Sequence, residues 1–168
     1  MTCPVDIELA DGDDLGAVTD LWVALARDQR EHGSHVGAET NRETMYATLG
    51  AHQVDDGLLV ARDGDSVVGF ASFAVEHGTL ELECRRGLLS NLYVEPAYRG
   101  NGIGTALLER VEERLSARGV EVCLLEAMVA NEAARRFYHS AGYEPFRIGY
   151  QRRLGHSSEN DTHSKEER

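Results

Sequence analysis

The stretch that decides the fold is Leu92-Tyr-Val-Glu-Pro-Ala-Tyr-Arg-Gly-Asn-Gly-Ile-Gly-Thr-Ala-Leu-Leu108. It begins as an apolar strand, passes through a loop with alternate glycines, and enters an amphipathic helix. Glycine lets the backbone approach a ligand closely. The first N–H groups of a helix have no intrahelical partner, and with the helix dipole they attract phosphate. The stretch therefore predicts a diphosphate cradle, with a helix-capping glycine turn as the alternative.

The spacing of the glycines argues against the two common nucleotide fingerprints. The Rossmann pattern is G-x-G-x-x-G, and the position three residues after Gly102 is Thr105. The Walker loop ends in Gly-Lys-Ser/Thr, and no lysine stands in this loop. A nucleotide-binding oxidoreductase domain is therefore disfavoured.

Outward from this stretch, strand and helix patterns alternate along the chain. We expect Val68, Phe70 and Ala74 to share one face of a strand, and the Asp-Gly turn at 62–65 to form a hairpin. The order predicts a mixed α+β fold, with a meander of strands followed by a β-α-β unit. Strands are expected at 5–9, 57–61, 66–76, 88–94 and 120–125, with one or two more within 143–154, and helices at 15–30, 41–52, 103–117 and 131–141.

The chain of 168 residues suits one domain, which we place at residues 1–154. Residues 155–168 are polar and are expected to form a disordered tail. No apolar run is long enough for a membrane span, and the first ten residues do not resemble a signal peptide. The sequence therefore predicts a cytoplasmic protein without a membrane partner.

The composition is strongly acidic, with a formal net charge of −12 and a pI near 4.9. This balance disfavours nucleic acid as a partner and suits cationic substrates. Lys165 is the only lysine among the 17 Lys and Arg residues. Adaptation to high salt and a GC-rich genome that favours Arg codons explain this bias equally well.

Cysteine and histidine residues give no pattern for a metal site. Cys3, Cys84 and Cys123 are far apart and form no C-x-x-C pair, so neither a zinc site nor a disulfide framework is expected, and Cys123 is expected to be a buried thiol. His32 and His35 have H-x-x-H spacing but no further ligands, which favours a surface loop.

The stretch around Arg99-Gly-Asn-Gly-Ile-Gly104 resembles the signature of the GCN5-related N-acetyltransferase (GNAT) superfamily, Gln/Arg-x-x-Gly-x-Gly/Ala. A second segment, Asn131-Glu-Ala-Ala-Arg-Arg-Phe-Tyr-His-Ser-Ala-Gly-Tyr-Glu-Pro145, resembles the second half of the family pattern at the usual separation. The resemblance implies a central mixed, mostly antiparallel twisted sheet flanked by helices. It also implies acetyl-CoA as co-substrate, an amine acceptor, no metal, and a homodimer as one assembly open to the chain.

By this resemblance, the backbones of Leu92 and Val94 bind the pantetheine arm, and the Val94 N–H polarises the thioester carbonyl. Asn131 touches the pantetheine as well as capping a helix. Tyr138 stands where the family has a tyrosine that protonates the departing thiolate. The pyrophosphate is held by Arg99, Gly100, Asn101, Gly102, Ile103, Gly104 and Thr105.

The general base is where the chain departs from its relatives. Ser90 and Asn91 occupy positions where family members often have an acid. Glu83, on the approach to this strand, is the leading candidate for the base, and Glu81 and Glu126 are two others. Because the base is not obvious, an acyl-CoA-binding sensor without turnover is the alternative to an N-acetyltransferase that works by direct attack in a ternary complex.

Overall fold

The computed structural model describes residues 4–155. Within that range the chain forms five strands and four α-helices, with short 3₁₀ turns before α1, α2 and α3. The helices and strands lie close to the predicted ranges. The elements are β1 (Asp6–Leu9), α1 (Leu15–Glu31), α2 (Arg42–Val54), β2 (Leu58–Asp63), β3 (Ser66–Val75), β4 (Arg86–Val94), α3 (Ile103–Ala117), β5 (Val122–Leu125) and α4 (Glu132–Ser140).

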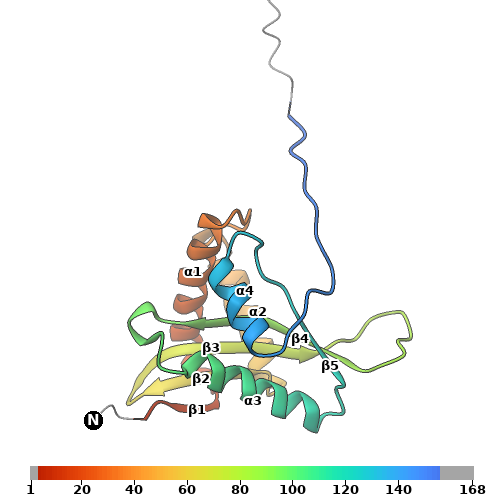
Figure 1. The fold of residues 1–168 in the computed structure, drawn as a ribbon. Coiled ribbons are helices and arrows are strands. Elements are labelled where there is room, and N and C mark those ends of the chain that lie inside the picture. The colour runs from red at the N-terminus through yellow and green to blue at the C-terminus, as the bar shows by residue number, and fades with distance from the viewer. Residues whose placement is uncertain (1–3, 156–168) are drawn as a thin grey trace, which may run out of the picture.

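The strands of the described residues form one sheet in the order β1-β2-β3-β4-β5. Neighbours from β1 to β4 are antiparallel, and β5 alone runs parallel to its neighbour β4. Figure 1 shows the helices on both sides of this sheet. The mixed, mostly antiparallel sheet flanked by helices, predicted from the sequence, is confirmed.

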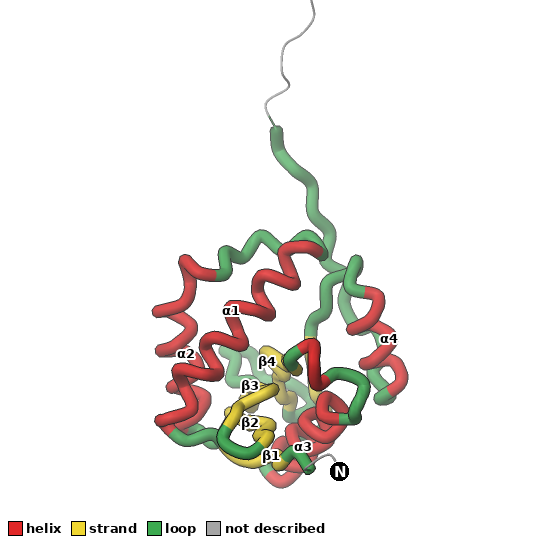
Figure 2. Tube along the Cα trace, turned by 90° about the vertical axis from the view of Figure 1, so that its left-hand side faces the viewer, coloured by secondary structure: helices red, strands yellow, loops and turns green. Residues whose placement is uncertain are grey.

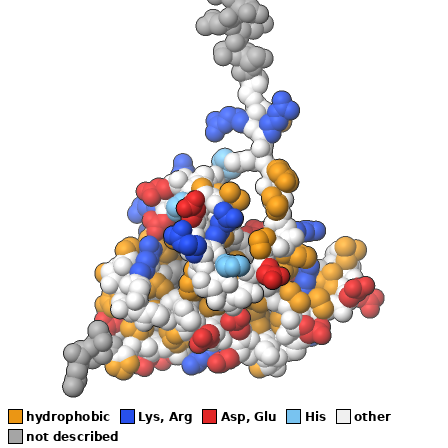
Figure 3. Space-filling model, viewed as in Figure 1, with side chains coloured by type: hydrophobic (Ala, Val, Ile, Leu, Met, Phe, Trp, Pro, Cys, Tyr) orange, Lys and Arg blue, Asp and Glu red, His pale blue; other side chains and the backbone are white. Residues whose placement is uncertain are grey.

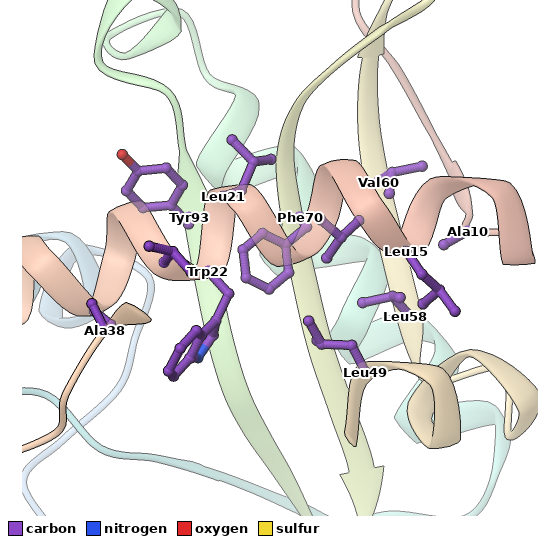
Figure 4. Close-up of a cluster of buried hydrophobic side chains, with 13 residues drawn as sticks. Ala10, Leu15, Leu21, Trp22, Ala38, Leu49, Leu58, Val60, Phe70 and Tyr93 are labelled. Carbon is purple, nitrogen blue, oxygen red and sulfur yellow. The ribbon is translucent and has the colours of Figure 1, made fainter. Parts of the chain in front are cut away.

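The two faces of the sheet carry separate hydrophobic cores. Helices α1 and α2 cover one face, and α3 and α4 lie on the other, as the end-on view shows (Figure 2). On the α1 side, Trp22 and Leu49 pack with strand residues such as Phe70 (Figure 4). On the α3 side, Leu107, Val111 and other apolar residues of the amphipathic helix pack on β2 to β4. The sheet is thus rigid where helices cover both faces.

The prediction that Val68, Phe70 and Ala74 share one face is wrong for Val68. The pairing of β2 with β3 shifts by one residue, from Ala61 opposite Gly69 to Arg62 opposite Val67. Val68 is the extra residue of this β-bulge, and it packs in the α3-side core while Phe70 packs in the α1-side core. A bulge reverses the alternation of side chains, so a regular two-residue period does not reveal it.

A buried ion pair fixes the start of α1 against the sheet. Asp14, 6% exposed, accepts a hydrogen bond of 2.6 Å from Arg62 of β2 and one of 2.9 Å from the Asp11 N–H. Arg62 also bonds Glu8 of β1. Burial alone would raise the pKa of Asp14, but the hydrogen bonds from Arg62 and Asp11 and the charge of Arg62 together lower it. The carboxylate therefore stays ionised and stabilises this junction.

The prediction of one or two strands within 143–154 is wrong for the described residues. No strand forms between Tyr143 and Gly155 in the part of the chain that the structure describes. The period-two pattern is present, since Phe146, Ile148 and Tyr150 alternate, but a strand also needs a partner for its backbone hydrogen bonds. Apart from Gly155, the predicted polar tail lies outside the described residues.

Candidate functional site

The site begins where β5 separates from β4. The parallel pairing ends at Leu89 opposite Leu125. At the same point the pairing of β3 with β4 shifts, from Phe73 opposite Leu89 to Ser72 opposite Asn91, so Ser90 is the extra residue of a bulge in β4. A bulge bends its strand and increases the local twist. The two strands consequently diverge beyond Leu89 and leave a cleft between β4 and the start of α4.

Residues from four parts of the chain line this cleft. Tyr138 and Asn131, both predicted site residues, meet there with Leu92 of β4. Glu126, the third of the candidate bases, follows β5 directly into the cleft. The remaining lining residues are Leu25 and Gln29 of α1, Leu89, Ser90 and Asn91 of β4, Leu125 of β5, Ala127 and Met128 after β5, and Ala134 of α4.

The backbones of Leu92 and Val94 face the open side of β4. The Glu95 N–H donates to the Val68 carbonyl at 2.8 Å, so Val94 opposite Gly69 is a non-hydrogen-bonded pair of the antiparallel ladder. By the same alternation the polar groups of Leu92 and Val94 point away from β3, towards the side that β5 has left. The N–H and C=O of Leu92 and the N–H of Val94 are therefore available to an extended ligand that runs along β4 as a strand would, whereas the Val94 carbonyl already accepts a hydrogen bond from Arg99.

The glycine loop leads directly into the start of α3. Gly100 and Gly102 have φ of +79° and +81°, a region that favours glycine. The Asn101 amide donates to the Tyr98 carbonyl at 3.2 Å and closes the turn. Gly102 is the N-cap, and no side chain among the described residues caps the helix. The N–H groups of the first turn, from Ile103 to Thr105, thus lack an intrahelical partner and form an anion site.

The side chain of Arg99 holds the loop against the protein body. Its Nε donates to the Val94 carbonyl at 2.8 Å, and its guanidinium lies 5.2 Å from the centre of the Tyr93 ring. It also reaches Asp28 of α1 at 3.4 Å. These contacts direct the side chain back towards β4 and α1, so we assign the anion contact at this position to the backbone of the loop rather than to the guanidinium.

Two features bring α4 to the cleft. Gly104, in the first turn of α3, lies beside the Phe137 ring of α4, and a Cβ there would make an ordinary contact of 3.5 Å with that ring. At the start of α4, the Asn131 side chain accepts a hydrogen bond of 3.1 Å from the Ala134 N–H. Asn131 therefore caps α4, and it also lines the cleft.

Tyr138 of α4 belongs to a cluster of aromatic side chains. Its ring packs edge-on against Phe137 and Tyr143, with centroids 5.1 and 5.9 Å apart. Burial, with a smaller contribution from the nearby Cys123 thiol, raises the pKa of Tyr138 to about 12. Cys123 itself is only half-buried. A phenol is already protonated near neutral pH at its ordinary pKa, and the raised pKa of Tyr138 leaves it in that state, as a proton donor requires.

The structure separates the three candidate bases. Glu83 and Glu81 lie in the exposed connection between β3 and β4, and neither is among the residues that line the cleft. Glu126 is the one acid in the lining. Asn91, in the position where relatives often have an acid, donates to the Ser72 hydroxyl at 2.8 Å, so its side chain is tied to β3.

Sequence reasoning did not identify Leu25 and Gln29 of α1, which both line the cleft. The helical spacing of Leu25 and Gln29 places them on one face, but only the packing of α1 shows that the cleft lies beside it. His35 pairs with Gln151 at 2.8 Å.

Residues 4–155 contain neither a cluster of metal ligands nor a helix that could cross a membrane. No group of three or more His, Cys, Asp or Glu side chains in this range is arranged to hold a metal ion. None of the helices described here has the length and apolar character to cross a membrane.

The open edge of β4 and Tyr138 line one cleft, and the uncapped start of α3 packs against α4 beside it. A model of the "Acetyltransferase (GNAT) family" matches residues 18–143. The chain therefore belongs to the GNAT family, and by class it is an acetyl-CoA-dependent N-acetyltransferase.

Two N-acetyltransferase or acetyltransferase relatives are about one third identical to this chain over the aligned residues. The IAA acetyltransferase of Azospirillum brasilense is 33% identical over 106 residues, which are 63% of this chain and 65% of the relative. The chain thus spans just under two thirds of that protein. The ribosomal protein bS18-alanine N-acetyltransferase of Escherichia coli K12 is 37% identical over 125 residues, 74% of this chain and 75% of the relative.

Solved structures with the same fold include two acetyltransferases. A GCN5-related N-acetyltransferase from Ralstonia eutropha JMP134 superposes with a TM-score of 0.69 at 26% identity, over 90% of this chain and 99% of the other. A predicted acetyltransferase from Clostridium acetobutylicum, solved with acetyl-CoA, has a TM-score of 0.68 at 19% identity, over 89% and 96%. The second likeness concerns the fold alone.

Proposed function

We propose that the protein transfers the acetyl group of acetyl-CoA directly to a primary amine within a ternary complex. The observation that carries this proposal is that the open backbone of β4 and Tyr138 line one cleft, and that the uncapped start of α3 packs against α4, the helix that carries Tyr138. Acetyl-CoA supplies the activated thioester. The chain supplies binding, orientation and proton transfer.

The backbone groups would bind the coenzyme from both ends. The free N–H groups at the start of α3, with the glycines at 100 and 102, fit a pyrophosphate, because a Cβ at either glycine would meet no protein atom within 4 Å. The free polar groups of Leu92 and Val94 fit the amides of a pantetheine arm. The Val94 N–H would stabilise the negative charge that develops on the acetyl oxygen during attack.

Two side chains would transfer protons in the reaction, one as donor and one as acceptor. Tyr138, which is neutral near pH 7, would donate its proton to the departing thiolate sulfur. An alkylamine is protonated near pH 7 and must lose a proton before it attacks. We assign that proton to Glu126, directly or through water, because it lines the cleft and Glu83 does not.

The central experiment measures coenzyme A release from acetyl-CoA with a panel of amines, against a reaction without amine. A peptide with an N-terminal alanine leads the panel, because one relative is named for that acceptor. A lysine peptide, a polyamine and an amino acid follow. We expect amine-dependent release. Tight acetyl-CoA binding without turnover on any amine would instead establish the sensor alternative.

The base assignment has its own matched test. Glu126→Gln should lower the activity and change the acidic limb of the pH–rate profile. Glu83→Gln should leave the profile unchanged, because the Glu83 carboxylate lies outside the cleft. A profile altered by Glu83→Gln and not by Glu126→Gln would reverse the assignment. Unchanged profiles in both variants would leave water or another group as the base.

The acceptor and the cellular setting are also proposals. The acidic composition supports a cationic amine, drawn in by the charge of the protein. We propose a cytoplasmic site of action and a homodimeric assembly. Fractionation of cells that express the tagged protein tests the first, and light scattering after gel filtration tests the second.

A further inference from the structure

The glycine loop is attached to the body of the protein by two side chains at its start. The Tyr98 hydroxyl donates to Asp63 of β2 at 2.7 Å. The Arg99 Nε donates to the Val94 carbonyl of β4 at 2.8 Å. The Asn101 side chain that follows donates to the carbonyls of Tyr98 and Arg99, inside the loop. Within the described residues, Arg99 is thus the last side chain before the glycine turn that fixes the loop to β4.

The peptide group that joins Val94 to Glu95, at the end of β4, is held from both sides. Its carbonyl accepts from Arg99, and its N–H donates to the Val68 carbonyl of β3 at 2.8 Å. Because that carbonyl is occupied, a ligand that runs along β4 can pair with Leu92 and with the Val94 N–H, and its pairing ends there. Arg99 therefore fixes the point at which the extended arm of a coenzyme would leave β4 for the start of α3.

A carboxylate on α1 holds the other end of the Arg99 guanidinium. One Nη lies 3.4 Å from an Asp28 oxygen, and each of the two side chains is 49% exposed. Asp28 stands about one turn after Leu25 and next to Gln29, which both line the cleft, so this part of α1 borders the site. The buried Tyr93 ring, seen beside α1 in Figure 4, lies against the same guanidinium.

The effect of Asp28 on Arg99 is local. A half-exposed ion pair contributes little to the free energy of unfolding. A long arginine side chain nevertheless loses rotational freedom when it is fixed, and a charge-assisted contact with a carboxylate offsets that loss. Without Asp28, Arg99 would turn to solvent more often, and the Val94 carbonyl would then lose its donor. The glycine loop would lose its contact with β4 at the same time.

The charge of Asp28 acts in the opposite direction on an anionic ligand. The chain has a formal net charge of −12, and acidic side chains are spread over the face shown in Figure 3. If charge alone decided affinity, the removal of a carboxylate close to the glycine loop would strengthen the binding of a phosphate-bearing ligand. A positioning effect through Arg99 and a direct charge effect therefore predict changes of opposite sign.

We propose that Asp28 is a positioning residue for coenzyme binding. It fixes the Arg99 guanidinium, and through it the Val94 carbonyl and the glycine loop, in the arrangement that accepts acetyl-CoA. This role rests on the proposed function for its ligand, and it is independent of the acceptor amine and of proton transfer. It adds to the coenzyme site a residue of α1 that lies outside both sequence motifs.

Calorimetric titration with acetyl-CoA compares the wild type with variants of Asp28. Asp28→Asn should raise the Kd about 5-fold, the upper end for a half-exposed ion pair, and Asp28→Glu should restore most of the affinity because it keeps the carboxylate. In an Arg99→Met background, Asp28→Asn should weaken binding no further. The control, Asp20→Asn, removes an acid of α1 that pairs with Arg42 and should leave the Kd unchanged.

Amide hydrogen exchange of the free protein gives a readout that needs no ligand. Asp28→Asn should speed exchange at residues 99–104 and leave the strands of the sheet protected. A Kd that is unchanged or lower in Asp28→Asn, with normal binding by the wild type, would overturn the positioning role and leave the proposed function intact. A wild type that does not bind acetyl-CoA would overturn both.

Discussion

The two ends of the sheet differ in how their strands are closed. From β1 to β4, antiparallel strands pair in sequence and helices cover both faces, with Phe70 and Phe73 fully buried. At the other end, β5 pairs with β4 over four residues and then diverges. The first region provides a frame, and the second leaves backbone groups and a cleft open to ligands. A fold can thus place its reactive groups where its own pairing stops.

This contrast predicts that changes at the open end reduce function with little loss of stability, and that changes in the closed frame do the reverse. The buried pair of Asp14 and Arg62 and the side chain of Tyr138 are suitable probes, because each acts within one region. The predictions below run from the largest expected effect to the smallest.

Removal of the Tyr138 hydroxyl should have the largest effect. Tyr138→Phe should lower kcat about 100-fold through loss of the proton donor, with KM for acetyl-CoA nearly unchanged. Steady-state coenzyme A release measures both. Tyr143→Phe is the control, since it removes a hydroxyl from the same cluster that bonds Glu112 at 3.3 Å and does not line the cleft. Equal losses in the two variants would contradict a special role for Tyr138.

A side chain on the glycine loop should weaken coenzyme binding next most strongly. Gly102→Asp places a like charge at the anion site and strains a residue with φ of +81°, so the Kd for acetyl-CoA should rise about 30-fold. Calorimetric titration measures it. Gly64→Asp introduces the same residue at φ of +59° in the β2–β3 hairpin, outside the cleft, and should bind normally. Similar weakening by both variants would refute the assignment.

In the closed frame, Asp14→Asn should cost about 2 kcal/mol of unfolding free energy, because it removes the buried charge that pairs with Arg62 and leaves Arg62 only its exposed partner Glu8. Urea unfolding at pH 7 measures the loss. The control Asp20→Asn alters a pair with Arg42 in which Asp20 is 67% exposed, and should change stability by less than about 0.5 kcal/mol.

The lowered pKa of Asp14 also sets a pH dependence for that difference. Its contribution is present above the ordinary Asp pKa near 3.8 and is lost as the pH falls through the lower folded value. The gap between wild type and Asp14→Asn should therefore narrow below about pH 4. A gap that stays constant down to pH 2 would show that the ion pair does not stabilise the fold.

The smallest effect is expected at alkaline pH. Burial raises the pKa of Tyr138 to about 12, so the folded chain ionises later than the unfolded chain. Stability is then full below about pH 10 and falls as the pH rises towards 12. Tyr138→Phe should reduce the slope, though not abolish it, because the pKa of Tyr143 is raised by burial too. A slope that is unchanged would mean that Tyr138 is solvated.

The sequence by itself determined the order of the elements, the glycine loop and the family. These features rest on local information: the period of apolar residues, glycines at 100 and 102 that require positive φ, and the two linked motifs that end at Pro145. Each depends on neighbours within a few residues, which is why the helices and strands up to Ser140 lie close to their predicted ranges.

Only the tertiary structure decided which residues meet. The bulges at Val68 and Ser90 depend on pairing between strands, so the periodicity of a single strand does not report them. The packing of α1 brought Gln29 to the cleft, and the path of the β3–β4 connection left Glu83 outside it. The segment after Tyr143 has a strand pattern and no strand, because a strand is completed by backbone hydrogen bonds to a partner strand, and residues 4–155 supply none.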